Sequence, residues 1–73
     1  MTEITIIIEK GNEKNKYKFY AFCLEIDLIC GFGNTIDECK KRLLENIETL
    51  RQRIDPSVKK LEDGYKIRYF IEE

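Results

Sequence analysis

Hydrophobic and polar residues alternate with a two-residue period in several short stretches of the chain, and with a period of three to four in one long stretch. Residues 4–9 are dense in β-branched side chains and predict a first strand. Alternation over residues 17–24, 28–32 and 65–71 predicts three more strands. Between the last two, apolar residues at steps of three and four predict one long helix over residues 36–54. The predicted order is β-β-β-α-β.

The helix has clear signals at both ends. Thr35 suits the N-cap position: its hydroxyl is expected to accept from the Glu38 N–H, and the Glu38 carboxylate is expected to return to the Thr35 N–H. Asp55 and Pro56 are expected to end the helix, because proline cannot continue its hydrogen bonding. The apolar stripe expected to face the sheet consists of Ile36, Cys39, Leu43, Ile47, Leu50 and Ile54.

This order of elements predicts an α+β fold with a four-stranded mixed sheet. Short connections favour an antiparallel meander of the first three strands, with a polar hairpin loop at residues 10–16. A right-handed crossover through the helix then places the fourth strand beside the first and parallel to it. The expected strand order is 3-2-1-4. We expect residues 57–64 to connect the helix to the last strand and to contain a short helical turn, and two glycines to weaken the third strand.

A single helix covers only one face of such a sheet. The residues expected on the covered face are Ile4, Ile6, Ile8, Phe19, Ala21, Cys23, Ile67, Tyr69 and Ile71. The opposite face then holds the candidate interface, which consists of Ile7, Lys18, Tyr20, Phe22, Arg68 and Phe70. Large apolar patches mark interaction sites, and aromatic residues with arginine are typical of protein interfaces. We therefore expect that this face, or the sheet edge beside it, is buried by self-association into a homo-oligomer or by a partner protein. The alternative is that Lys and Arg stems cover the aromatic rings.

Length and charge narrow the class of protein. The 73 residues predict one domain spanning residues 1–73. Thirteen basic residues against 14 acidic ones give a net charge of −1, so no global field attracts nucleic acid or anionic lipid. The N-terminal residues lack a signal-peptide pattern, and no stretch approaches the ~20 apolar residues of a membrane span. We expect a cytoplasmic protein without a membrane partner.

The residues that usually carry chemistry do not form a recognisable set. The chain has no histidine, and its three cysteines, Cys23, Cys30 and Cys39, match no zinc spacing. Their odd number and their places in predicted elements favour reduced, structural thiols. The segment Gly31–Gly33 lacks the third glycine of a dinucleotide fingerprint and the lysine of a P-loop. We therefore expect no enzyme activity, no metal and no cofactor.

The charged side chains near strand ends and on the helix are expected mainly to be exposed to solvent. The carboxylates considered for metal or acid–base chemistry are Glu9, Glu25, Asp27 and Asp37, and nothing in the sequence brings two of them together. Basic clusters at residues 40–42 and 51–53 are expected to be neutralised by the pairs Glu38–Arg42, Lys41–Glu45 and Glu48–Arg51. An alternative function is an oligomeric nucleic-acid-binding module that uses the basic and aromatic sheet face.

Several of these segments together resemble the HicB antitoxin family. The likeness lies in Ile4–Lys10, in Tyr20–Cys23, and in Gly33–Cys39 with the helix continuing through Asn46 and Ile47. It spans about residues 3–50. The resemblance implies a partial ribonuclease-H-like fold without that enzyme's catalytic carboxylates. It also implies a type II toxin–antitoxin role, in which the antitoxin forms dimers or tetramers and blocks the active site of a small HicA-type mRNA-cleaving toxin.

The chain departs from the family pattern at two places. The Pro-Glu-Leu-Pro-Gly-like turn after the second strand is replaced by Leu24–Leu28. Nothing in the sequence resembles the C-terminal DNA-binding domain of many family members, so operator binding is not expected.

Overall fold

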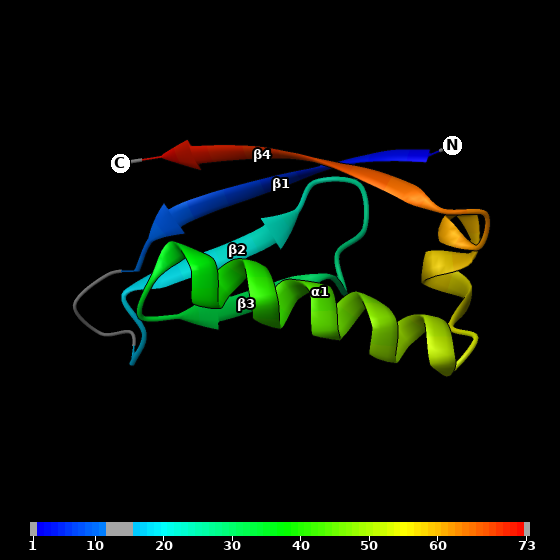
Figure 1. Cartoon of the computed structure of the whole chain (residues 1–73), viewed down its shortest axis with the longest axis horizontal. Helices are drawn as coiled ribbons and strands as arrows, with labels where there is room; N and C mark the ends of the chain where they lie inside the picture. Colours follow the sequence, from blue (N-terminus) through cyan, green and yellow to red (C-terminus); the bar gives the residue numbers. More distant parts are fainter. Residues whose placement is uncertain (1, 12–15, 73) are drawn as a thin grey trace.

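The computed structural model describes residues 2–11 and 16–72, which form four strands, one α-helix and one short 3-10 helix (Figure 1). The predicted hairpin loop falls largely on residues 12–15, outside the described residues. The elements in chain order are β1 (Thr2–Lys10), β2 (Phe19–Cys23), β3 (Cys30–Gly33), α1 (Ile36–Gln52), η1 (Pro56–Leu61) and β4 (Tyr65–Glu72).

The sheet has the predicted topology. Its strand order is β3-β2-β1-β4, with β1 antiparallel to β2, β2 antiparallel to β3, and β1 parallel to β4. Because β1 and β4 are parallel, the chain must cross from one end of the sheet to the other between them, and α1 with η1 makes that crossing (Figure 1). The α+β fold expected from the sequence is confirmed.

The core lies between one face of the sheet and α1. Ile4, Ile6 and Ile8 are fully buried, as their spacing on one side of β1 predicted. Four residues of the predicted helical stripe lie buried against them: Cys39, Leu43, Ile47 and Leu50. The predicted helical turn in the connector is η1, and its Val58 and Leu61 extend the core, which sequence reasoning did not anticipate.

Small residues determine where α1 lies on the sheet. It packs mainly on β3 and β2, whose core-facing positions include Ala21, Gly31 and Gly33. A Cβ atom on Gly31 would lie 2.8 Å from the Cys39 carbonyl oxygen and 2.8 Å from the Leu43 nitrogen. The sequence predicted only that these glycines weaken β3. In the structure they also permit α1 to approach β3 closely.

One half of the predicted capping box forms at the start of α1. The Thr35 hydroxyl accepts from the Glu38 backbone N–H at 3.0 Å. The Glu38 carboxylate pairs with Arg42 at 3.1 Å, which confirms this expected helix pair. It does not bond to the Thr35 N–H, so the other half of the capping box is not formed. The expected pair Glu48–Arg51 also forms, at 3.0 Å.

The predicted end of the helix is wrong by two residues. The helix ends at Gln52, and Ile54, expected in the buried stripe, is 80% exposed with φ +54°. Two backbone bonds explain this: the Ile54 N–H donates to the Arg51 carbonyl at 3.0 Å, and the Asp55 N–H donates to the Leu50 carbonyl at 3.1 Å. This Schellman arrangement places a left-handed residue after the helix and turns Ile54 away from the core.

Three strand predictions also need correction. The third strand begins at Cys30, because Leu28 lies in an exposed turn. The second strand is Phe19–Cys23, shorter at both ends than predicted. Ile71, expected on the covered face, is 47% exposed because α1 lies over β2 and β3 and leaves the end of β4 uncovered. The first and last strands are instead longer than predicted, Thr2–Lys10 and Tyr65–Glu72.

Within the described residues, no helix has the length and apolar character needed to span a bilayer.

Candidate interaction surface

The sheet face opposite α1, called the outer face below, brings apolar side chains of adjacent strands into rows. Ile7 lies opposite Phe22 of β2 on one side and opposite Phe70 of β4 on the other. Side chains directly opposite one another in neighbouring strands point to the same face and lie in contact distance. Three of the predicted interface residues are therefore neighbours in one row across three strands.

A second row is aromatic, and it includes a residue that sequence reasoning did not assign to the interface. Tyr20 lies opposite Phe32 of β3, with ring centroids 5.0 Å apart. The Tyr20 ring also stacks on Phe22 at 5.5 Å, and Tyr17 contacts Phe32 at 5.7 Å. Phe32 escaped assignment because glycines flank it on both sides, and a glycine gives no hydrophobic signal for its face.

These two rows form one surface, called the apolar band below, which consists of Ile7, Tyr20, Phe22, Phe32 and Phe70. Phe70 is 48% exposed and Phe32 is 43% exposed, while the other three side chains are half-buried. Partial burial is the first cause that raises the pKa of Tyr20, followed by the nearby Cys30 and Glu9. The Tyr20 hydroxyl therefore stays protonated at neutral pH and can donate a hydrogen bond within an otherwise apolar surface.

The two basic candidates do not form a cluster on the outer face. Arg68 forms an ion pair with Glu3 of β1. Lys18 precedes β2 at the end of the sheet, where its carbonyl accepts from the Gly11 N–H at 2.8 Å. Across the sheet, Glu9 lies opposite both Tyr20 and Glu72. The outer face thus has charges of both signs around its apolar band.

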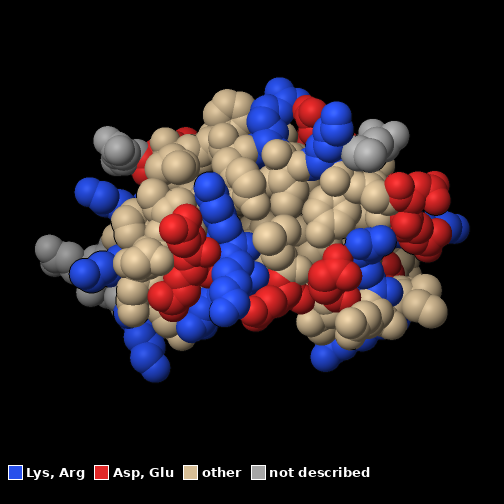
Figure 2. Space-filling view, viewed as in Figure 1, with Lys and Arg blue, Asp and Glu red and all other residues tan. Residues whose placement is uncertain are grey.

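The side of the molecule that carries α1 is also mixed in charge. Figure 2 shows basic and acidic groups interspersed over the lower half, where α1 lies, an uncharged area above it, and further charged groups of both signs along the top edge, where β4 runs in Figure 1. Such interspersed charges favour solubility and do not create a single-sign field.

Of the candidate carboxylates, Glu25 has a defined structural role. Its Oε1 accepts from the Thr5 backbone N–H at 2.7 Å and lies 3.4 Å from the Cys23 Sγ. The bond from the Thr5 backbone N–H is the main cause that lowers the Glu25 pKa. Because the chain leaves β2 after Cys23, the Glu25 side chain takes over the hydrogen bonding of β1 at this point.

The three cysteines are free, as the sequence predicted. Cys23 and Cys39 are buried, and burial is the main cause that raises the pKa of both thiols. A raised pKa reduces the thiolate fraction, and thiolate is the nucleophilic form. Cys30 is half-buried next to the apolar band, and its backbone N–H donates to the Asn46 Oδ1 at 3.1 Å.

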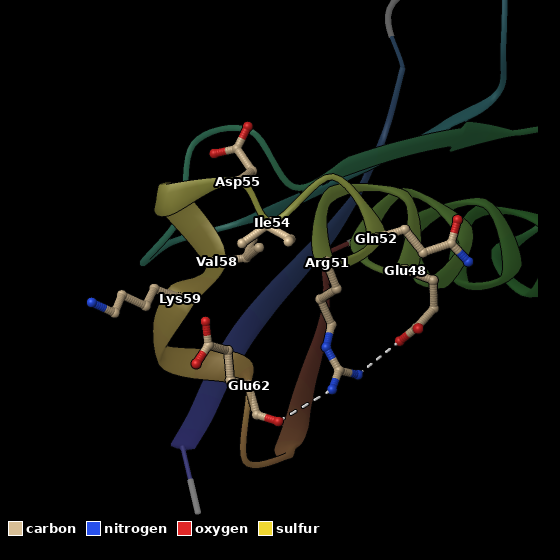
Figure 3. Close-up of a pocket in the computed structure, with 8 residues that line it drawn as sticks. All are labelled: Glu48, Arg51, Gln52, Ile54, Asp55, Val58, Lys59 and Glu62. Atoms are coloured by element: carbon tan, nitrogen blue, oxygen red, sulfur yellow. Dashed lines mark hydrogen bonds and ion pairs between the residues drawn. The ribbon is translucent and has the colours of Figure 1, made fainter.

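A hollow of about 430 Å³ lies between the end of α1 and η1 (Figure 3). Arg51 crosses it and bonds to the Glu48 carboxylate at 3.0 Å and to the Glu62 carbonyl at 3.4 Å. Asp55 caps η1 by accepting from the Ser57 N–H at 2.9 Å. Arg51 and Asp55, two polar groups of this hollow, are therefore held by hydrogen bonds to neighbouring residues. Its lining residues are Glu48, Arg51, Gln52, Ile54, Asp55, Val58, Lys59 and Glu62.

Residues 2–11 and 16–72 contain no group of three or more His, Cys, Asp or Glu side chains that could hold a metal ion. Comparison with known proteins gives no match, whether to a family model, to a curated protein or to a solved structure. The HicB-like resemblance therefore depends on the sequence segments alone and stays a prediction.

Proposed function

We propose that this chain is a non-enzymatic, HicB-like antitoxin domain that binds and inhibits a small HicA-type mRNA-cleaving toxin through protein–protein contacts. The observation that supports this most is the apolar band, where Phe32 and Phe70 expose 43% and 48% of their surface on a rigid sheet. Exposed aromatic side chains held by a regular scaffold are the usual anchors of protein interfaces.

The charges around the band favour a protein partner over nucleic acid. Proteins that bind single strands combine stacking aromatic rings with a positively charged groove. The aromatic rings are present, but Arg68 is paired with Glu3, and Glu9 and Glu72 lie side by side at one end of the band. Acidic groups beside an apolar band would repel phosphate and attract a basic, RNA-binding surface.

The chain would inhibit the toxin by covering its basic, RNA-binding surface. A nuclease that cuts mRNA must expose basic groups to hold the phosphate backbone. The apolar band would anchor the complex, while Glu9 would neutralise basic groups of the toxin and help to exclude the RNA. No bond is made or broken on this chain in such a mechanism.

The test is co-purification with the product of the neighbouring gene, combined with rescue of growth when that product is toxic. Phe32→Glu should weaken the complex by roughly tenfold or more and abolish rescue, because it places a charge within the aromatic row of the anchor. Ile54→Glu is the matched control: Ile54 is 80% exposed at the hollow beside η1, so the complex should be unchanged. Circular dichroism checks that both variants are folded.

Two outcomes contradict this proposal. One is a complex that tolerates Phe32→Glu as well as Ile54→Glu. The other is retention of RNA or DNA at moderate salt that is lost in Lys18→Ala and Arg68→Ala, which would establish the nucleic-acid-binding alternative.

A further inference from the structure

We infer that β4 pairs with β4 of a second copy of this chain, antiparallel across a two-fold axis at Tyr69, so that two sheets join into one. This inference depends only on the chain itself and stands apart from the toxin-binding proposal.

The free edge of β4 is the first observation. β4 is the last strand of the sheet, and β1 is its only neighbour among the described strands. It is eight residues long and contains neither proline nor glycine. In Figure 1 it runs along the top of the molecule, with no described element beyond it. A long edge without such interruptions offers a row of unpaired backbone groups to another strand.

The opposite edge of the sheet is protected in several ways that β4 lacks. β3 is only four residues long and contains two glycines. Its first N–H, on Cys30, donates to the Asn46 side chain from α1 at 3.1 Å. Short strands and covering side chains are the usual means of blocking an edge. The contrast identifies β4 as the edge available for pairing.

β4 also exposes apolar side chains on both faces. Phe70 on the outer face is 48% exposed, and Ile71 on the helix side is 47% exposed. A second strand beside β4 would cover part of each.

The charges of β4 select one register. In an antiparallel pair, residues directly opposite each other share a face of the sheet. A two-fold axis must therefore pass between one residue and the same residue of the second copy. With the axis at Tyr69, Lys66 lies opposite Glu72 of the second copy, and the reverse pair forms as well. Ile67 then lies opposite Ile71 of the second copy, and Arg68 lies opposite its Phe70. These three pairs are oppositely charged, apolar and cation–aromatic respectively, and the two Tyr69 side chains meet at the axis.

Neighbouring registers are worse. An axis at Arg68 places two Arg68 side chains opposite each other, and an axis at Ile67 places Lys66 opposite Arg68. An axis at Phe70 also places Arg68 opposite Glu72, an oppositely charged pair, but it joins only residues 68–72 of each described β4, against residues 66–72 with the axis at Tyr69. Within one copy, Glu72 lies opposite Glu9, a like-charged neighbour, so a lysine from the second copy would relieve that repulsion.

Pairing at this edge leaves most of the apolar band free. Ile7, Tyr20, Phe22 and Phe32 lie on β1, β2 and β3, away from the joined edge. The dimer would therefore present two bands on one continuous sheet surface.

A charge exchange tests the register with the chain alone. Sedimentation between about 1 µM and about 1 mM should show wild-type dimer, with twice the 8.7 kDa of one chain. Lys66→Glu and Glu72→Lys should each weaken dimerisation by roughly tenfold or more, because each places two like-charged pairs across the axis. The double variant K66E/E72K should restore the dimer. An equimolar mixture of the two single variants should also associate, since both opposing pairs are then complementary.

Lys41→Glu, on the exposed side of α1, is the control for a general effect of charge and should leave the dimer unchanged. The inference is overturned if the wild type stays monomeric up to about 1 mM. It is equally overturned if the double variant is as weak as the single ones, or if the two single variants fail to associate when mixed.

Discussion

Glu25 illustrates how one exposed side chain can complete a strand. Its carboxylate accepts the Thr5 N–H at 2.7 Å, at the point where β2 has ended and no backbone carbonyl fills this position. The sequence placed Glu25 among possible catalytic acids, because spacing alone does not show that a carboxylate is bonded to a backbone group. Its assigned role is therefore structural, and it gives a pH-dependent contribution to stability.

Glu25→Gln should remove that contribution. The Glu25 pKa is lowered in the folded state, so the stabilisation is fully present above the unfolded pKa of about 4.3 and is lost as pH falls through the folded value. The free energy of unfolding, measured with urea, should fall by about 1 kcal/mol at neutral pH, a modest value because the group is exposed. The difference from wild type should shrink toward pH 3.

Asp27→Asn in the same loop is the control, since no hydrogen bond of the Asp27 side chain holds a described strand. A Glu25→Gln deficit of the same size at neutral and acidic pH would contradict the account.

At the scale of elements, the end of α1 is where the hydrophobic pattern misleads. Ile54 continues the spacing of the buried stripe, so the sequence predicts that the helix reaches it. Periodicity counts side chains and does not register the backbone reversal, in which Ile54 takes φ +54°. Pro56 two residues later was the better signal, since helices commonly end shortly before proline.

Ile54→Gly should therefore stabilise the protein. A left-handed conformation costs a β-branched residue roughly 1–2 kcal/mol, and glycine adopts it freely. Because the Ile54 side chain is 80% exposed, little buried surface is lost, and we expect a gain of about 1 kcal/mol in the free energy of unfolding. Ile54→Ala keeps a Cβ and should gain less. A loss of stability in Ile54→Gly would mean that the Ile54 side chain makes a contact important to the fold.

The remaining elements show what a sequence pattern does and does not contain. Alternation and the capped helix were enough to predict four strands, their order and the confirmed sheet topology. The position of α1 was not predictable, because it depends on Gly31 and Gly33, which have no side chain to enter a hydrophobic count. For the same reason Phe32 was left out of the predicted interface, although it contacts Tyr20 at 5.0 Å.

At the scale of the whole molecule, the position of α1 over β3 and β2 leaves two surfaces of the sheet exposed. Because α1 packs on β3 and β2, it covers one sheet face unevenly and leaves the end of β4 exposed, while the outer face is left uncovered throughout. The apolar band and the β4 edge therefore share only Phe70, and the first is proposed for a protein partner and the second for a second copy. The rows of the band were predictable in part, since strand alternation sets the face of each residue. Which residues lie opposite one another depends on the register, which the structure provides.

The most direct test of the central claim is an amide chemical-shift titration of this chain with the small toxin proposed as its partner. The account predicts that the largest changes fall on the outer-face positions Ile7, Tyr20, Phe22 and Phe32, while amides on the exposed side of α1 and around Ile54 stay in place. Changes confined to α1 or to the hollow beside η1, with the apolar band unperturbed at saturation, would contradict it.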